Sequence, residues 1–207
     1  MAIPVNNYEE FDRLVNMLWK KTPLFGFVLH DSREGHKPVA SFLKESAQWL
    51  DELAMQSGIF ILFPLRKRLG TFINPSPGIA RKFGLSSKRL PGIILLTTGE
   101  DPEDLPSNHF LFVPLVATDF SDVKKMEATL SDLFSLVQET LRKEFRGHDA
   151  LEEIRKQLSN RRKRKKKHSI IQSLRKGAQI VLIKIPEKFL SAFAEGIGKA
   201  LGTSAFL

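Results

Sequence analysis

Residues 25–54 read FGFVLHDSREGHKPVASFLKESAQWLDELA, and this stretch decides the fold. It begins with an apolar run, passes through the polar turn Asp31–Lys37 and continues into a long amphipathic segment. The apolar residues of that segment recur at helical spacing: Val39, Phe42, Leu43, Leu50, Leu53 and Ala54. The pattern predicts a buried strand, a turn and a helix whose first turn lies beside the strand's end. In α/β proteins, functional groups gather at such places.

The same reasoning extends outward along the chain. Continuous apolar runs predict buried strands at Leu24–His30 and Ile59–Leu65, and a hairpin pair at Gly92–Thr98 and His109–Ala117. Helical spacing of apolar residues predicts a first helix that ends near Lys21, a short helix at Ile79–Phe83 and a long one from Val123 to Phe145. We therefore expect an α/β protein with a mixed sheet flanked by helices.

This order of elements is similar to that of the thioredoxin fold. The resemblance covers about residues 5–146 and rests on the element order and on Pro91, which opens a strand. In that family the proline before the third core strand is cis, and a Cys-x-x-C redox pair begins the long helix. Arg33-Glu34-Gly35-His36 occupies about the place of that pair. The resemblance therefore implies a thioredoxin-like fold in a redox-inactive member.

The composition excludes several kinds of chemistry. The chain has no cysteine, so disulfides, thiol catalysis and cysteine-ligated zinc are excluded. The histidines show no paired metal-ligand spacing, and no Gly-rich phosphate loop or nucleophile elbow occurs. We therefore expect that the protein has no catalytic activity and binds no cofactor. The first ten residues resemble no secretory signal and no window is long enough to span a bilayer, so we expect a cytoplasmic protein, peripheral to a membrane.

The charge is distributed unevenly. Residues 1–146 contain 18 Lys/Arg and 18 Asp/Glu, whereas residues 147–207 contain 14 and 5, which accounts for the net charge of +9. This change in charge after residue 146 predicts a body (1–146), a basic helix or linker (147–168) and an amphipathic C-terminal segment (169–207). A cationic extension of this kind predicts an anionic partner.

A second basic group is predicted on the body. If the fold resembles thioredoxin, the start of the long helix, the end of strand 59–65 and the Pro91 loop share one edge of the sheet. The candidate anion-binding residues there are Arg33, His36, Arg66, Lys67, Arg68, Lys88 and Arg89. Helix amides and several cations together suit a phosphate. The alternative is that these residues are ordinary solvated loop charges.

The extension has two parts. The first ends in seven consecutive cations, Arg161, Arg162, Lys163, Arg164, Lys165, Lys166 and Lys167, which is typical of lipid-binding or nucleic-acid-binding segments, or of a solubilising linker. The second carries apolar residues at helical spacing, Phe189, Leu190, Phe193, Ile197 and Leu201, interspersed with glycines. It resembles membrane-active amphipathic helices. The alternative is that it packs on the body or dimerises.

Three functions are consistent with these features. The first is a non-catalytic module whose tail engages an anionic membrane and acts as a membrane-perturbing effector, because this uses both parts of the tail. The second is a nonspecific DNA- or RNA-binding protein that uses the basic run and the basic edge through phosphate contacts. The third is an interaction module that docks an acidic protein or assembles into a homo-oligomer.

Overall fold

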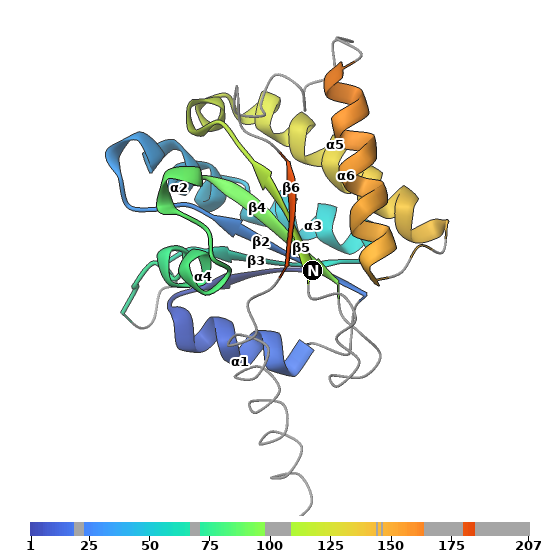
Figure 1. Ribbon diagram of the computed structural model, residues 1–207. Coiled ribbons are helices and arrows are strands. Elements are labelled where there is room, and N and C mark those ends of the chain that lie inside the picture. The colour runs from blue at the N-terminus through green and yellow to red at the C-terminus, as the bar shows by residue number, and fades with distance from the viewer. Residues whose placement is uncertain are drawn as a thin grey trace, which may run out of the picture.

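The computed structural model of the chain describes residues 1–18, 23–66, 71–97, 109–143, 145, 147–163 and 180–184 (Figure 1). Its centre is one mixed sheet with the strand order β1-β3-β2-β4-β5-β6. The strands are β1 (Ala2–Val5), β2 (Leu24–Leu29), β3 (Phe60–Pro64), β4 (Gly92–Thr97), β5 (His109–Pro114) and β6 (Val181–Lys184). β1, β3 and β2 run parallel, and β4, β5 and β6 continue the sheet in antiparallel pairs.

The strands predicted from apolar runs are present. β2, β3, β4 and β5 match them, and β4 pairs antiparallel with β5 as a hairpin pair. The expected fold class, an α/β protein with a mixed sheet flanked by helices, is confirmed. The Leu90–Pro91 peptide bond before β4 is cis. Two edge strands were not predicted: β1 has only four residues and contains Pro4, and β6 lies inside the predicted C-terminal segment.

Helices cover both faces of the sheet. They are α1 (Tyr8–Leu18), α2 (Lys37–Glu45), α3 (Ala47–Ser57), α4 (Ser76–Lys82), α5 (Val123–Arg142) and α6 (Gly147–Lys163). Short 3-10 segments are η2 (Glu34–His36), η3 (Ser87–Arg89) and η4 (Ala117–Ser121).

The long helix predicted after residue 36 is divided into α2 and α3 at Ser46, whose ψ of 17° departs from helical geometry. Hydrogen bonds nevertheless run through the break, from Ser46 N–H to Phe42 O and from Leu50 N–H to Ser46 O, both 2.8 Å. The predicted apolar stripe therefore stays on one side, with Val39, Phe42 and Leu50 buried.

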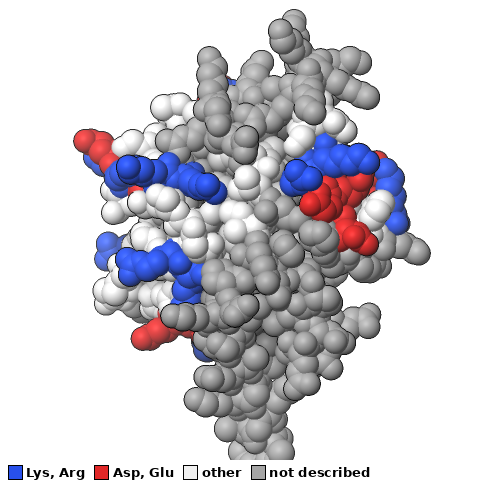
Figure 2. Space-filling model, viewed as in Figure 1, with Lys and Arg blue, Asp and Glu red and all other residues white. Residues whose placement is uncertain are grey.

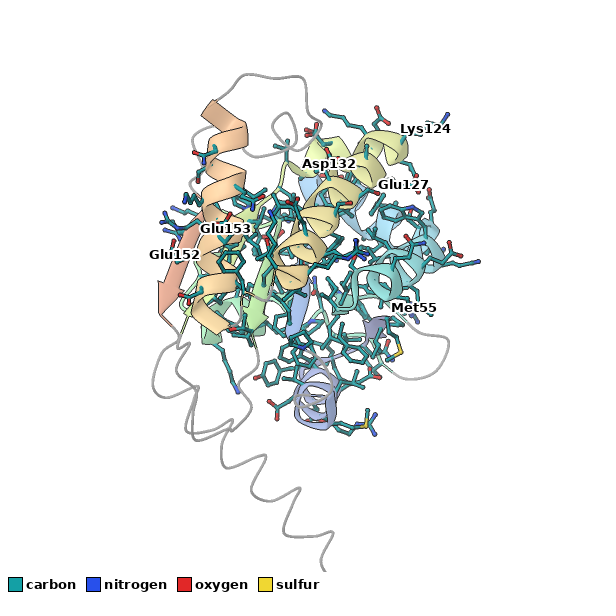
Figure 3. The ribbon with its side chains drawn as sticks, turned by 90° about the vertical axis from the view of Figure 1, so that its right-hand side faces the viewer. Met55, Lys124, Glu127, Asp132, Glu152 and Glu153 are labelled. Atoms are coloured by element: carbon teal, nitrogen blue, oxygen red, sulfur yellow. The ribbon has the colours of Figure 1, made fainter. Side chains whose placement is uncertain are left out.

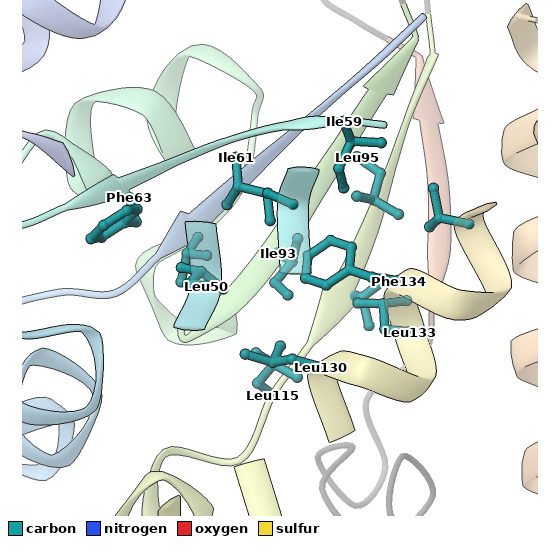
Figure 4. Close-up of a cluster of buried hydrophobic side chains, with 14 of the residues drawn as sticks. Leu50, Ile59, Ile61, Phe63, Ile93, Leu95, Leu115, Leu130, Leu133 and Phe134 are labelled. Carbon is teal, nitrogen blue, oxygen red and sulfur yellow. The ribbon is translucent and has the colours of Figure 1, made fainter. Parts of the chain in front are cut away.

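Alternation along the strands separates two hydrophobic clusters. On one face, Ile61 and Phe63 of β3 and Ile93 and Leu95 of β4 pack beneath α2, α3, α5 and α6. Figure 4 shows these strand residues beside Leu50 of α3 and Leu130, Leu133 and Phe134 of α5. The other face is rich in phenylalanine and packs against α1 and α4. The sheet is therefore the middle of three layers.

The core continues past residue 146. Helix α6 buries Ala150, Leu151, Ile154 and Leu158 against the sheet, and β6 pairs with β5. The boundary drawn at residue 146 from the charge step therefore differs from the packing, which includes α6 and β6 in the body. The few apolar residues of α6 are spaced to form one buried stripe, whereas the rest of the helix is strongly polar, and that polarity dominated the sequence pattern.

The outer side of β1 offers few hydrogen-bond donors. The carbonyls of Met1 and Val5 accept bonds from Ile61 and Leu65 on the β3 side, so the alternate residues Ala2 and Pro4 face outward. Ala2 donates its N–H to Asp51 Oδ1 at 2.6 Å, and proline has no N–H to donate. The described outward donors of this strand are thus already satisfied or absent.

Candidate anion-binding edge of the sheet

The parallel strands β1, β2 and β3 end at one edge of the sheet, and segment 71–75 crosses that edge. Ile73 donates its N–H to Asn6 O, just after β1, at 2.9 Å. Asn74 Nδ2 donates to His30 O, just after β2, at 3.0 Å. His30 in turn donates its N–H to Ser76 Oγ at 3.2 Å. These bonds join the first strands to the start of α4 and fix the shape of the edge.

Asp31 is the centre of a charged group at this edge. Its carboxylate forms an ion pair with the Arg33 guanidinium and lies 2.5 Å from His36 Nδ1. It also accepts the Arg33 backbone N–H at 3.1 Å. The side chains of Asp31 and His36 are about nine-tenths buried, whereas half of the Arg33 side chain is exposed. The Asp31 backbone N–H also donates to His36 Nδ1, at 3.2 Å.

His30, beside this group, is a core residue, as its place on the apolar strand predicted. Its Nδ1 lies 3.0 Å from the carbonyl of Asp31. Burial lowers the pKa of the ring below its ordinary value, against smaller opposing effects of Asp31. The ring is therefore neutral at neutral pH and contributes no positive charge to the edge.

Arg33 connects the turn after β2 to η3. Its Nη2 donates to Ser87 O at 2.9 Å. η3 is itself held from both sides, because Leu85 and Leu90 are buried and Ser86 Oγ caps the N–H of Lys88 at 3.3 Å. The backbone that bears the cations of η3, Lys88 and Arg89, is thus held in place.

The structure brings together part of the predicted anion-binding set. Arg33, His36, Lys88 and Arg89 lie at this edge, and Arg66 follows β3 at the same end. Lys67 and Arg68 lie outside the described residues. Asp31 already pairs with Arg33 and His36, so these two residues are less available to a ligand than the sequence suggested. Among the described residues, the guanidinium groups of Arg66 and Arg89 have no ionic partner.

Sequence reasoning missed further members of this surface. Arg81 and Lys82 end α4, next to η3, and both side chains are exposed. Lys82 Nζ lies 4.6 Å from the centre of the Tyr8 ring. Ile73, on segment 71–75, is 66% exposed. One signal was present in the sequence: no Asp or Glu occurs between Glu52 and Glu100, although seven cations do.

Basic side chains gather on more than one side of the molecule. In the view of Figure 2, lysine and arginine atoms gather at the left, over η3 and α4, and also at the right, where acidic side chains lie among them. Figure 3 shows the right-hand side of the molecule, where Glu127 and Asp132 of α5 and Glu152 and Glu153 of α6 are labelled. Within the described part of the chain, the basic edge and this partly acidic face point in different directions.

Three of the predicted tail-contact residues belong to α6. Arg161, Arg162 and Lys163 form the last residues of α6. The other predicted contact residues lie outside the described residues: Arg164, Lys165, Lys166, Lys167, Phe189, Leu190, Phe193, Ile197 and Leu201. The described residues contain no group of three His, Cys, Asp or Glu side chains placed to hold a metal ion.

No described helix is both long enough and apolar enough to cross a bilayer.

Compared with known proteins, the chain matches no family model, and no curated protein sequence is similar to it.

Proposed function

We propose that this chain is a non-catalytic, thioredoxin-like module whose polybasic C-terminal part engages an anionic membrane. The order β2, α2–α3, β3, α4, Pro91, β4–β5 and α5 supports the thioredoxin-like assignment, since this is the order on which the resemblance rests. The Leu90–Pro91 bond is cis, as the resemblance implies. Arg33-Glu34-Gly35-His36 stands in place of a redox pair, which supports a role in binding rather than in thiol chemistry.

One observation carries the membrane proposal: the cationic run begins at the end of a helix that is docked on the body. Leu151, Ile154 and Leu158 anchor α6, and the run starts within its last turn. Cations at a helix C-terminus are favoured by the helix dipole. The body therefore holds the backbone at the start of the run, and Arg164–Lys167 follow directly in the sequence.

Two contributions favour a membrane over other anions. A cation near an anionic leaflet contributes about 1 kcal/mol. The apolar residues at helical spacing between Phe189 and Leu201 in the sequence would add burial at the headgroup boundary, a contribution that a phosphate ligand alone does not provide. Stable attachment needs two such signals, and this chain has both. Where the membrane is intracellular, the protein would be peripheral to its cytoplasmic face.

The test neutralises the run in the full-length protein. Ending the chain after Gly147 would remove the buried stripe of α6 as well as the cations, so a truncation cannot separate binding from folding. We expect Arg164, Lys165, Lys166 and Lys167 changed together to Gln to lower affinity for vesicles containing phosphatidylserine by about tenfold or more, since each cation contributes about 1 kcal/mol. Vesicle flotation measures this affinity, with pure phosphatidylcholine as the uncharged comparison.

A control variant removes the same charge elsewhere. Lys44, Lys124, Arg142 and Lys156 are exposed, and none has an acidic partner among the described residues. Changing these four to Gln should leave flotation nearly unchanged. Equal losses in both variants would show a nonspecific charge effect and contradict the proposal. Binding to RNA or DNA that falls steeply with salt, without flotation, would support the nucleic-acid alternative instead.

A further inference from the structure

Ile73 is the most exposed of the large hydrophobic side chains in the described residues, at 66%. Its exposure is set by the fold. Its N–H is bonded to Asn6 O, and the next residue, Asn74, bonds His30 O and also accepts the Ser76 N–H at 3.0 Å. The backbone on both sides is therefore fixed across the strand ends, and the isoleucine side chain is held outward.

Both signs of charge lie near Ile73. Asn6, whose carbonyl accepts the Ile73 N–H, donates its own N–H to Glu10 Oε2 at 2.8 Å, and arginines lie towards the same edge. Segment 71–75, teal in Figure 1, lies on the same side as α4 and η3. Arg66 follows β3 at this edge, and Arg81 and Arg89 belong to α4 and the adjoining η3. The guanidinium groups of these three arginines have no ionic partner among the described residues. The stretch that contains them has no acidic residue between Glu52 and Glu100.

We infer that this edge is a second membrane-contacting surface, with Ile73 entering the headgroup boundary and Arg66, Arg81 and Arg89 facing lipid phosphates. An exposed apolar side chain with cations towards the same edge suits an anionic bilayer, because the apolar side chain is buried while each guanidinium contacts phosphate. A nucleic-acid backbone would match the arginines but would bury nothing of the isoleucine. The acidic residues of α5 and α6 lie on another side, where they do not oppose this contact.

The inference rests on the membrane function proposed above but is carried by different residues. It adds an orientation: the C-terminal edge of the parallel strands faces the bilayer. Attachment through the tail alone would leave the body free to face any direction.

The experiment uses the absence of cysteine, since one introduced cysteine can be labelled uniquely. Ile73→Cys in the full-length protein, labelled with the environment-sensitive fluorophore NBD, should show a blue shift and a rise in intensity with phosphatidylserine vesicles. The matched control is Met55→Cys, because Met55 is 65% exposed on α3 and lies on the face shown in Figure 3. The emission of the same fluorophore at residue 55 should not change when vesicles are added.

The outcomes separate this inference from the proposed function. The protein could float with the vesicles while the NBD emission at residue 73 stays constant, or while it changes equally at residues 73 and 55. Either result would overturn the edge contact and leave the proposed function of the tail intact. Absence of flotation would overturn both. A change at residue 73 with RNA but not with vesicles would assign the edge to nucleic acid and also overturn the inference.

A binding measurement tests the same inference independently. Ile73→Asp should lower affinity for the anionic vesicles by about tenfold, the loss expected when partial burial of one isoleucine is removed. Met55→Asp introduces the same charge and should change affinity little. Circular dichroism of both variants would show whether the fold is kept. Equal losses in the two folded variants would contradict a contact at this edge.

Discussion

Gly92 begins β4 at a point where there is no room for a side chain. A Cβ atom placed there would lie 2.5 Å from Phe112 Cε2 and 2.9 Å from Val113 O. Phe112 is fully buried in the phenylalanine-rich cluster, and Val113 belongs to the paired strand β5. Neither group can move without disturbing the sheet, so the requirement for glycine here comes from packing.

We therefore expect Gly92→Ala to lower the free energy of unfolding by about 2–3 kcal/mol, the usual cost of overpacking a tight core. Gly35→Ala is the control, because a Cβ at Gly35 meets nothing within 4 Å. Urea denaturation of both variants measures the difference. A Gly92→Ala protein as stable as the Gly35→Ala protein would show that β4 and β5 pack less tightly than described.

His30 should make stability depend on pH. Burial lowers the pKa of the folded ring, so below about pH 6.5 the unfolded chain binds a proton that the folded chain does not. Stability is therefore full above that pH and is lost as the pH falls towards the folded pKa, by at most about 1.4 kcal/mol per pH unit for one group. Denaturation of the wild type and His30→Gln between pH 7.5 and 5.5 should show a smaller slope in the variant. Equal slopes would contradict this assignment, since the other histidines are common to both proteins.

At the scale of elements, α6 shows how a strongly polar helix can belong to the core. Ile154 lies at the middle of its buried stripe and has no exposed surface. We expect Ile154→Ala to cost about 2–4 kcal/mol of unfolding free energy, from lost burial and the cavity left behind. Lys156→Ala, on the exposed side of the same helix, should cost little. Thermal or urea unfolding distinguishes them, and near-wild-type stability of Ile154→Ala would restore the domain boundary at residue 146.

Strong local patterns predicted the interior strands and helices. β2 and β3 are continuous apolar runs, and the stripe of α2 and α3 is regular enough to persist through Ser46. β1 and β6 were missed because each is short and is defined by its neighbour in the sheet rather than by its own pattern. Pairing between distant segments carries no local signal.

The candidate site was partly predictable for a similar reason. Topology placed Arg33, Lys88 and Arg89 at one edge, as the element order indicated. The sequence did not indicate that Asp31 would turn inward and pair with both Arg33 and His36, because that depends on side-chain geometry. Ile73 was also missed, since an isolated apolar residue in a loop has no periodic partner.

At the scale of the whole molecule, the described charges are mixed on some sides and mainly basic over η3 and α4 (Figure 2). Arg66 follows β3 at the edge where the parallel strands end, and Arg81 and Arg89 belong to α4 and η3, whereas α5 and α6 carry both signs of charge on another side (Figure 3). A group of cations on one side raises the positive potential there, which attracts that side to an anionic surface. Raised salt should therefore weaken the approach to anionic vesicles more than any apolar contact made after it.

The outer side of β1 has a consequence for self-association. A strand from a second copy laid along β1 would meet carbonyl oxygens but no available amide hydrogens, because Asp51 holds one and Pro4 lacks one. The hydrogen bonds that β1 would have to donate to the added strand would therefore be missing. Amyloid-like stacking of copies, sheet edge on sheet edge, is thus stopped at this end of the sheet by one carboxylate and one pyrrolidine ring.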